Sequence, residues 1–123
     1  MAALVRETPM LYTMLIFQPP YDEPARAAQM AAWPPYIEAL RAAGVFAGGG
    51  GLQEPATATT LRFQGNERIV QDGPYADTKE QIGGFVVLDV PDLDVALDWA
   101  ARAPRAPGRV LEIRPNLMPP APR

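Results

Sequence analysis

The sequence predicts an α+β fold, in which one sheet carries two helices on a single face. Strand-like and helix-like segments follow one another in the order β-α-β-β-β-β-α-β along 123 residues. Two of the strand segments are apolar on both faces, while only two segments have helical periodicity. A chain of this length forms one domain, so residues 1–123 are treated as a single unit whose core spans residues 11–115.

The first strand is expected at Leu11–Phe17, where apolar side chains occupy both alternating faces. One face carries Leu11, Leu15 and Phe17, and the other carries Tyr12, Met14 and Ile16. A strand that is apolar on both sides is typical of the centre of a sheet that is covered on both sides.

The first helix is expected after this strand. Asp22 or Glu23 can cap it, and Pro24 is acceptable in its first turn. Its apolar stripe consists of Met30, Trp33, Ile37 and Leu40. Because proline cannot donate the helical hydrogen bond, Pro34-Pro35 predicts a kink or two short helices. Gly44 then stands where a helix-ending glycine is expected.

A run of four glycines, Gly48–Gly51, follows a short strand that begins at Val45-Phe46. Such runs usually form flexible turns or irregular strand edges. Alternatively, they allow the backbone to approach a ligand closely. The run is not a phosphate-binding loop, because it lacks the G-x-G-x-x-G spacing and no helix follows it.

The middle of the chain is expected to form a hairpin. Thr57–Phe63 alternates and is rich in threonine, Gln64–Asn66 is a turn, and Glu67–Gln71 is the returning strand. Gly84–Val90 is then a second strand with two apolar faces.

A second helix and a last strand complete the pattern. Asp92 caps the helix and Pro104 ends it. The inner stripe of this helix is expected to consist of Leu93, Ala96, Leu97 and Ala100. Arg109–Arg114 is the last strand, and residues 115–123 form a proline-rich tail. This order is similar to a ferredoxin-like split βαβ unit with an inserted hairpin.

The two doubly apolar strands also predict a homodimer. Both helices pack on one sheet face in this layout, and no other segment can cover the second face. Burying one large apolar side chain fully contributes roughly 1.5–3 kcal/mol to stability. A domain of this size with that face in water would therefore be hard to stabilise and prone to associate. We therefore expect two copies to join sheet to sheet.

Three residue types are absent from the sequence: histidine, cysteine and serine. Their absence excludes the usual nucleophilic triads within one chain, and also zinc sites built from imidazole or thiolate. Acid–base work would fall to Asp, Glu, Lys or Tyr. We predict no metal site and no cofactor.

The charge distribution limits the expected partners. With a net charge of −3 and scattered arginines there is no basic patch, so nucleic acid is not an expected partner. No apolar stretch is long enough to span a bilayer, and the first nine residues lack the apolar centre of a secretory signal. We therefore expect a cytoplasmic protein with no membrane partner.

The polar run Asp72–Gly84 has a nearly complete structural interpretation. Asp72-Gly73-Pro74 is a turn, and Thr78-x-x-Gln81 matches a capping box for a short helical turn. Gly83-Gly84 would let the chain re-enter the sheet closely packed. This interpretation leaves Lys79 unexplained, because it is the only lysine and every other basic residue is arginine.

A functional interpretation of the same run assigns chemistry to its charged groups. Asp72 or Glu80 would be the catalytic acid–base group, and Lys79 would orient or neutralise an anion. The candidate ligand-binding residues are Tyr12, Tyr75, Thr78 and Arg114. The ordinary alternative for Tyr12 is packing in the core, and for Arg114 it is solvation or an ion pair. Trp33 and Trp99 can line a pocket, although tryptophans on helices more often belong to the core.

Several motifs, taken together, resemble one family. They are Ala42-Ala43-Gly44-Val45, Thr57-Ala58-Thr59-Thr60, Asp72-Gly73-Pro74, Thr78-Lys79-Glu80-Gln81, Gly83-Gly84-Phe85, Val90-Pro91-Asp92-Leu93-Asp94, Ala100-Ala101-Arg102 and Glu112-Ile113-Arg114-Pro115. The chain resembles the YCII-related family, in the DGPF-domain branch that is named for Asp-Gly-Pro-Phe. Tyr75 stands where that motif has phenylalanine.

The resemblance implies a ferredoxin-like fold assembled as a dimeric α/β barrel. Some members are suggested to use a catalytic His–Asp pair, which cannot be carried over because this sequence has no histidine. Members of the DGPF branch often occur beside, or fused to, sigma factors of the extracytoplasmic-function type, which implies a link to transcription.

Two functions stay open at this point. The first is a small-molecule-binding homodimer, with an anionic ligand in a pocket between sheet and helices that Asp72–Gly84 would wall. The second is a protein-interaction module in transcriptional regulation, such as a partner of a sigma factor.

Overall fold

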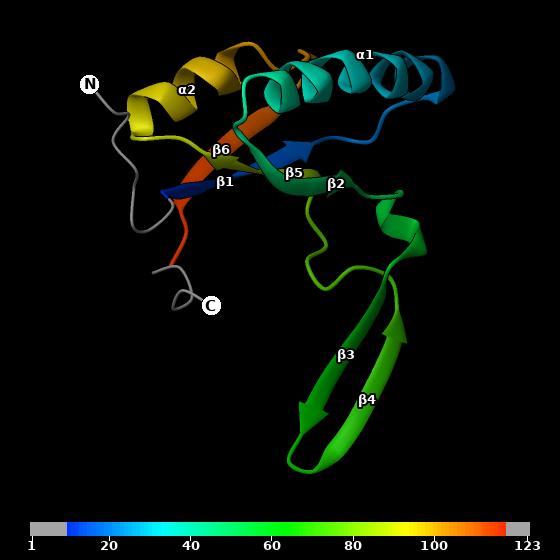
Figure 1. Cartoon of the computed structure of the whole chain (residues 1–123). Coiled ribbons are helices and arrows are strands. Elements are labelled where there is room, and N and C mark those ends of the chain that lie inside the picture. The colour runs from blue at the N-terminus through cyan, green and yellow to red at the C-terminus, as the bar shows by residue number, and fades with distance from the viewer. Residues whose placement is uncertain (1–9, 118–123) are drawn as a thin grey trace, which may run out of the picture.

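The computed structural model describes residues 10–117. One four-stranded sheet carries both helices on a single face, and a two-stranded hairpin projects from the opposite side (Figure 1). The elements are β1 (Leu11–Gln18), α1 (Glu23–Ala42), β2 (Phe46–Gly51), the 3₁₀ turn η1 (Pro55–Thr57), β3 (Thr59–Gln64), β4 (Glu67–Asp72), β5 (Gln81–Asp89), α2 (Leu93–Ala101) and β6 (Val110–Pro115). Of the predicted proline-rich tail, residues 118–123 lie outside the described residues.

The topology confirms the predicted α+β class. The sheet order is β2-β5-β1-β6 and every neighbouring pair is antiparallel. Strand β5 lies between β1 and β2, so the first βαβ unit is split, and the arrangement is compatible with a ferredoxin-like fold. Neither helix within residues 10–117 is long and apolar enough to cross a membrane.

The helix-covered face of the sheet holds the core. Its buried strand residues are Tyr12, Met14, Ile16, Val86 and Leu88, and the helices add Tyr36, Leu40, Ala96 and Ala100. These alternate with half-buried or exposed neighbours, so only one of the two apolar faces of β1 and of β5 is covered among the described residues. The opposite face, with Leu15 and Phe85 at its centre, has no covering element among the described residues.

Helix α1 begins and ends as its sequence predicts. The Asp22 carboxylate accepts a hydrogen bond from the Ala25 backbone N–H at 2.9 Å. Past its other end, Gly44 has a φ of 73°, a conformation that glycine adopts without strain.

One continuous helix runs through Pro34 and Pro35, so the expectation of two short helices is wrong. The two prolines remove the hydrogen bonds that the carbonyls of Met30 and Ala31 would accept. All four residues are exposed, so water can satisfy these carbonyls.

Helix α2 is capped by Asp92, whose carboxylate accepts from the Val95 N–H at 2.9 Å. The predicted inner stripe is half wrong. Ala96 and Ala100 are buried, but Leu93 and Leu97 are 46% and 48% exposed. Small alanines on the buried side let the helix lie close to the sheet, and the two leucines face away from the core.

The predicted hairpin is confirmed, but its first strand begins later than expected. Thr57 belongs to the 3₁₀ turn η1, in which its N–H and its hydroxyl both donate to the Glu54 carbonyl. Pro55 at the first position of that turn favours this conformation over a strand.

Tyr36 joins the two helices. Its hydroxyl donates to the Trp99 carbonyl at 2.7 Å, in the last turn of α2, where the same carbonyl also accepts from the Arg102 N–H at 3.1 Å. Burial raises the pKa of Tyr36 to about 12, and the opposing effect of Arg102 is smaller.

Replacing this hydroxyl should change both stability and its pH dependence. We expect Tyr36→Phe to lower the free energy of unfolding by about 1 kcal/mol at pH 7, because the hydrogen bond that joins the two helices is lost. In the native protein, the unfolded chain loses the Tyr36 proton near pH 10 and the folded chain near pH 12. Stability is therefore complete below pH 10 and falls by about 2–3 kcal/mol as the pH rises to 12, a fall that the variant should lack.

Urea unfolding at pH 7, 10 and 11.5 would measure both effects. Tyr75→Phe is the matched control, because Tyr75 is 80% exposed and its removal should leave the pH dependence unchanged. Equal alkaline destabilisation in all three proteins would contradict the assignment to Tyr36.

Candidate functional site

A cavity of about 700 Å³ lies between α1 and the sheet, beside β2 and β5. Apolar side chains dominate its walls, chiefly Ile16, Met30, Trp33, Ile37 and Phe46. Its volume falls within the range that small-molecule sites in proteins occupy.

The cavity exists because side chains are missing from one end of the helix-covered sheet face. Residues that pair across strands share a face, and three rows of pairs cross this face. The row Phe46–Leu88–Tyr12 carries three large side chains, the next row is Gly49–Val86–Met14, and the last is Gly51–Gly84–Ile16. Space therefore opens beneath α1 as the rows lose side chains.

Two of these glycines are required by close contact. A Cβ atom at Gly84 would lie 2.9 Å from the Gly50 carbonyl oxygen, and one at Gly49 would lie 2.4 Å from the Phe85 carbonyl oxygen. Gly51 differs, because a Cβ atom there meets nothing within 4 Å. The glycine run is thus the edge strand β2, as the first interpretation of its sequence predicts, and it also forms part of the cavity floor.

Helix α1 forms the roof of the cavity. Met30, Trp33 and Ile37 follow one another at helical spacing and all line the cavity. Trp33 is half-buried, with its ring edge-on to Tyr36 at 5.5 Å. Met30 is 78% exposed, which leaves an apolar side chain at the opening.

A half-buried guanidinium, that of Arg109, closes one end of the cavity. Its Nε and Nη2 atoms donate to Gln18 Oε1 at 3.2 and 2.8 Å. Its Nη1 atom donates to Gln29 Oε1 at 2.6 Å and to the Pro104 carbonyl at 2.9 Å. The guanidinium carbon lies 5.4 Å from the Trp33 ring centre and 5.9 Å from that of Tyr21.

The charge of Arg109 has no carboxylate partner within residues 10–117. Burial lowers the pKa of the guanidinium, and Tyr21 acts weakly in the opposite direction. An arginine stays protonated in proteins, so this end of the cavity keeps a positive charge.

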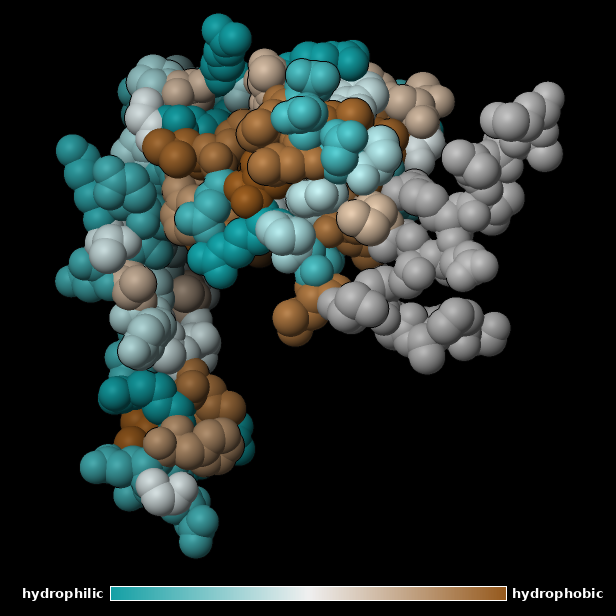
Figure 2. All heavy atoms as spheres, turned by 90° about the vertical axis from the view of Figure 1, so that its left-hand side faces the viewer, coloured by the Kyte–Doolittle hydropathy of each residue, from teal (hydrophilic) through white to brown (hydrophobic). Residues whose placement is uncertain are grey.

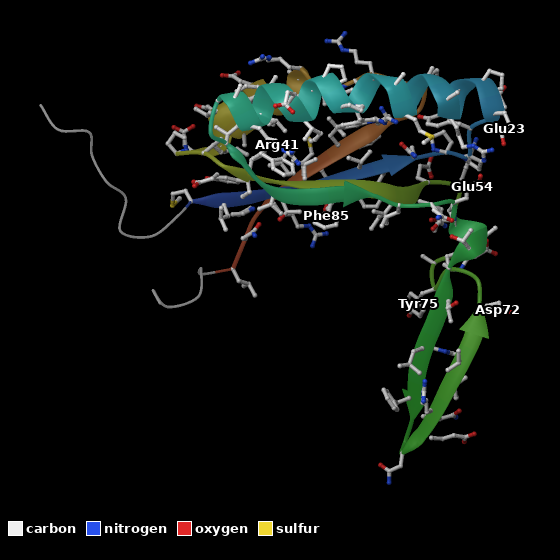
Figure 3. The ribbon with its side chains drawn as sticks, turned by 45° about the vertical axis from the view of Figure 1, so that its right-hand side comes forward. Glu23, Arg41, Glu54, Asp72, Tyr75 and Phe85 are labelled. Atoms are coloured by element: carbon white, nitrogen blue, oxygen red, sulfur yellow. The ribbon has the colours of Figure 1, made fainter. Side chains whose placement is uncertain are left out.

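The other arginines of the cavity have different surroundings. Arg26 forms ion pairs with Glu23 and Glu54, which lie close together beside the start of α1 (Figure 3). Arg41, near the other end of α1, is exposed and lies over the Phe46 ring at 5.0 Å.

The residues that sequence reasoning singled out as catalytic do not line this cavity. Asp72 ends β4 at the base of the hairpin, with Tyr75 nearby (Figure 3). Lys79 and Glu80 are exposed in the loop before β5, and Lys79 has no ion pair within the described part of the chain. From the run Asp72–Gly84, only Gly83 and Gly84 reach the cavity.

The short helical turn expected at Thr78–Gln81 does not form. The Gln81 amide nitrogen instead donates to the carbonyls of Ala76 and Thr78 at 2.6 and 2.8 Å, and the Thr78 hydroxyl donates to the Glu80 carbonyl. These bonds hold the segment as an irregular loop, because they use side-chain donors for carbonyls that a helix would pair with backbone N–H groups.

Tyr12 and Arg114 occupy opposite faces of the sheet. Tyr12 is 9% exposed in the core beneath the helices. Arg114 is on the uncovered face, where its Nε donates to the Glu112 carboxylate at 2.6 Å. Both therefore show the ordinary roles that the sequence also predicted, packing and an ion pair.

Sequence reasoning missed Arg109, Gln18 and Gln29. One signal in the sequence could have found Arg109 and Gln18. In a split βαβ sheet the first and last strands are antiparallel neighbours, so the end of the first strand meets the start of the last. Gln18 and Arg109 are the polar residues at those two positions.

Comparison with known proteins agrees with the resemblance seen in the sequence. The family model described as the YCII-related domain matches residues 10–116. An uncharacterised protein of Rhizobium meliloti (strain 1021) is 51% identical over 49 residues. That match spans 40% of this chain and 40% of the relative's own length.

The cavity floor leads to a prediction about its glycines. Gly84→Ala should lower the free energy of unfolding by about 1–3 kcal/mol, because the new methyl group would force the backbone of β2 away. Gly51→Ala should leave it unchanged or raise it by up to about 1 kcal/mol, because the methyl group enters open space and restricts the unfolded chain. Urea unfolding of both variants would test this, and a harmless Gly84→Ala would contradict the close contact.

Proposed function

The chain belongs to the YCII-related domain family, and we propose that it is a homodimeric domain that binds a small anionic organic molecule between α1 and the sheet. The observation that carries this proposal is the cavity of about 700 Å³ with apolar walls and an uncompensated guanidinium at one end. An apolar cavity with a few convergent polar groups is the usual form of a small-molecule site.

The polar groups of the cavity favour binding over catalysis. Among the described residues that line it, Glu54 is the only carboxylate, and Glu54 is ion-paired with Arg26. The Tyr21 hydroxyl donates to the Pro107 carbonyl. Guanidinium and amide groups remain, and these orient a ligand but do not serve as a general base at neutral pH.

Acid–base chemistry by Asp72, Lys79 and Glu80 stays a prediction. All three side chains are exposed in a single chain, so a second surface would have to cover them before they could act on a substrate shielded from water. The motif Asp72-Gly73-Pro74-Tyr75 at this place supports assignment of the chain to the DGPF branch of the family.

The uncovered sheet face supports the homodimer. It carries Leu15, Phe17, Ile82, Phe85 and Val87, in the rows opposite to those of the core. Phe85 and Ile82 are 39% and 41% exposed although they lie in the middle of a sheet. A second copy placed on this face would bury these side chains.

The hairpin, which we call the arm (residues 59–72), supports the same partner. Strands β3 and β4 pair only with each other, and an isolated two-stranded hairpin is marginally stable in water. One face of the arm carries Leu61, Phe63 and Val70, which are 50%, 68% and 54% exposed. Figure 2 shows hydrophobic atoms gathered on the arm. The arm extends from the side of the sheet that lacks helices (Figure 1), so a copy seated on that face would also meet the arm.

The binding part of the proposal predicts that filling the cavity abolishes ligand binding. Gly51→Leu should place a side chain beneath α1 without backbone strain, because the position is open and has no positive φ. We expect binding of 2-naphthylacetate, measured by isothermal titration calorimetry, to weaken at least ten-fold. Ala47→Leu, on the same strand but outside the cavity lining, is the control that should bind normally. Unchanged binding by Gly51→Leu would refute this location.

The dimer part predicts the effect of charges on the two apolar surfaces. Phe85→Glu and Phe63→Glu should each shift a wild-type dimer toward monomer at micromolar concentration, because a carboxylate would be buried without a partner. Light scattering coupled to size exclusion would measure the mass. Leu93→Glu is the control, since Leu93 is 46% exposed on α2, on the other side of the sheet.

Two outcomes would contradict parts of this assembly. A monomeric wild type would refute the dimer and leave these surfaces for a different protein, as the interaction-module hypothesis requires. A dimer that tolerates Phe63→Glu but not Phe85→Glu would refute the role of the arm alone.

A further inference from the structure

The surroundings of Arg109 define the chemical class of the ligand more narrowly. Resting on the proposed binding function, we infer that the cavity takes a monocarboxylate with an apolar, ring-bearing body. Arg109 would bind the carboxylate, and the body would lie among Trp33, Ile37 and Phe46.

The first argument is charge. The Arg109 guanidinium is held by two glutamine side chains and one backbone carbonyl, all neutral acceptors. A half-buried cation without a counterion binds an anion more strongly than an exposed one does, because the effective dielectric constant around it is lower. The carboxylate of a ligand would supply the counterion that the chain does not.

The second argument is preorganisation. Four hydrogen bonds and two aromatic rings fix the guanidinium before any ligand arrives. Four of its five N–H groups are engaged, which leaves one on Nη2 for a ligand oxygen. The Gln18 side-chain amide holds Arg109 through its oxygen, and its nitrogen has no hydrogen-bond partner within residues 10–117. This nitrogen can therefore donate to the second oxygen of the ligand carboxylate. Little side-chain entropy would then be lost on binding.

The third argument is that the positive charge at the Arg109 end of the cavity matches a ligand with one negative charge and not one with two. Arg26 is already matched by Glu23 and Glu54, which together leave that part of the cavity edge negative. Lys79, the one lysine, does not line the cavity.

Arg41 also lines the cavity without a carboxylate partner among the described residues, but it is exposed and lies near the C-terminal end of α1. Gln29, which holds Arg109, lies 12 residues earlier in the helix, about 18 Å away along its axis. A phosphate dianion bound at Arg109 would therefore meet one cation, and a carboxylate pair nearby.

The fourth argument concerns the body of the ligand. The rest of the lining is mainly apolar under α1, where it includes the rings of Trp33 and Phe46. The exposed Met30 side chain at the opening can cover an apolar body, because methionine adapts to the shape of its contacts. A ring system attached to the carboxylate by a short linker would fill this space.

The experiment uses three probes that share one ring system: 2-naphthylacetate, the neutral 2-naphthylacetamide and the dianion 2-naphthyl phosphate. Dissociation constants are measured by calorimetry for the full-length wild type, Arg109→Gln and Arg105→Gln. Arg105 is the matched control, because it is exposed and outside the cavity lining while its loss changes the net charge equally.

We expect the wild type to bind the carboxylate at least ten-fold more tightly than the amide and the phosphate. Arg109→Gln should weaken the carboxylate by a similar factor while the amide changes less than two-fold, and Arg105→Gln should behave as the wild type does. Equal affinity of the wild type for acid and amide would overturn the inference, as would tighter binding of the phosphate. Equal loss of both probes in Arg109→Gln would assign Arg109 a purely structural role.

Failure of the proposed function looks different from failure of this inference. If no probe binds, or if Gly51→Leu binds all three as the wild type does, the cavity is not a binding site. If Arg109→Gln does not fold, the wild-type preference for acid over amide, and its decline between 0.02 and 0.5 M salt, decide the question in solution.

Discussion

The missing side chains at Gly49, Gly51 and Gly84 are the constraint on which the rest of this structure depends. Helix α1 is held to the sheet near its C-terminal end, where Leu40 and Tyr36 are buried over full-sized partners. Toward its N-terminal end the same helix passes over the rows that contain these glycines, so fewer side chains fill the space below it. One helix thus packs against the core at one end and covers a cavity at the other. Its residues that stabilise the fold, Tyr36 and Leu40, differ from those that line the proposed binding cavity, Met30, Trp33 and Ile37.

Covering only one sheet face has a second consequence. The other face and the arm both expose large apolar side chains, among them Phe85, Ile82 and Phe63, and exposed apolar surfaces of this kind favour a partner. Both surfaces lie away from the helices, whereas the cavity lies beneath a helix. The proposed assembly and the proposed ligand binding would therefore use opposite faces of one sheet, so a change at one surface need not disturb the other directly.

Much of the fold could be predicted because its signals are local. The caps Asp22 and Asp92, the closing Gly44 and the two-faced strands each follow from a few neighbouring residues. The errors arose where tertiary contacts determine which residues are buried. Leu93 and Leu97 look more suited to a core than Ala96 does, yet a helix that lies close to the sheet needs the smaller residue. The cavity was beyond local reasoning, because it depends on the register of three strands and not on any one segment.

The contrast between Lys79 and Arg109 shows why composition is a weak guide to a site. Lys79 attracts attention as the only lysine, but it lies exposed in a loop, where a cation interacts mainly with water. Arg109 is one of ten arginines, and its one distinguishing sequence context is its place at the start of the predicted last strand. What distinguishes it is its position at the start of β6, opposite Gln18 and beneath Gln29, where neutral acceptors hold its charge beside an apolar space. The energy that a charge can contribute to binding depends on its burial and its partners, and in this chain those properties are set by the sheet order that brings the first and last strands together.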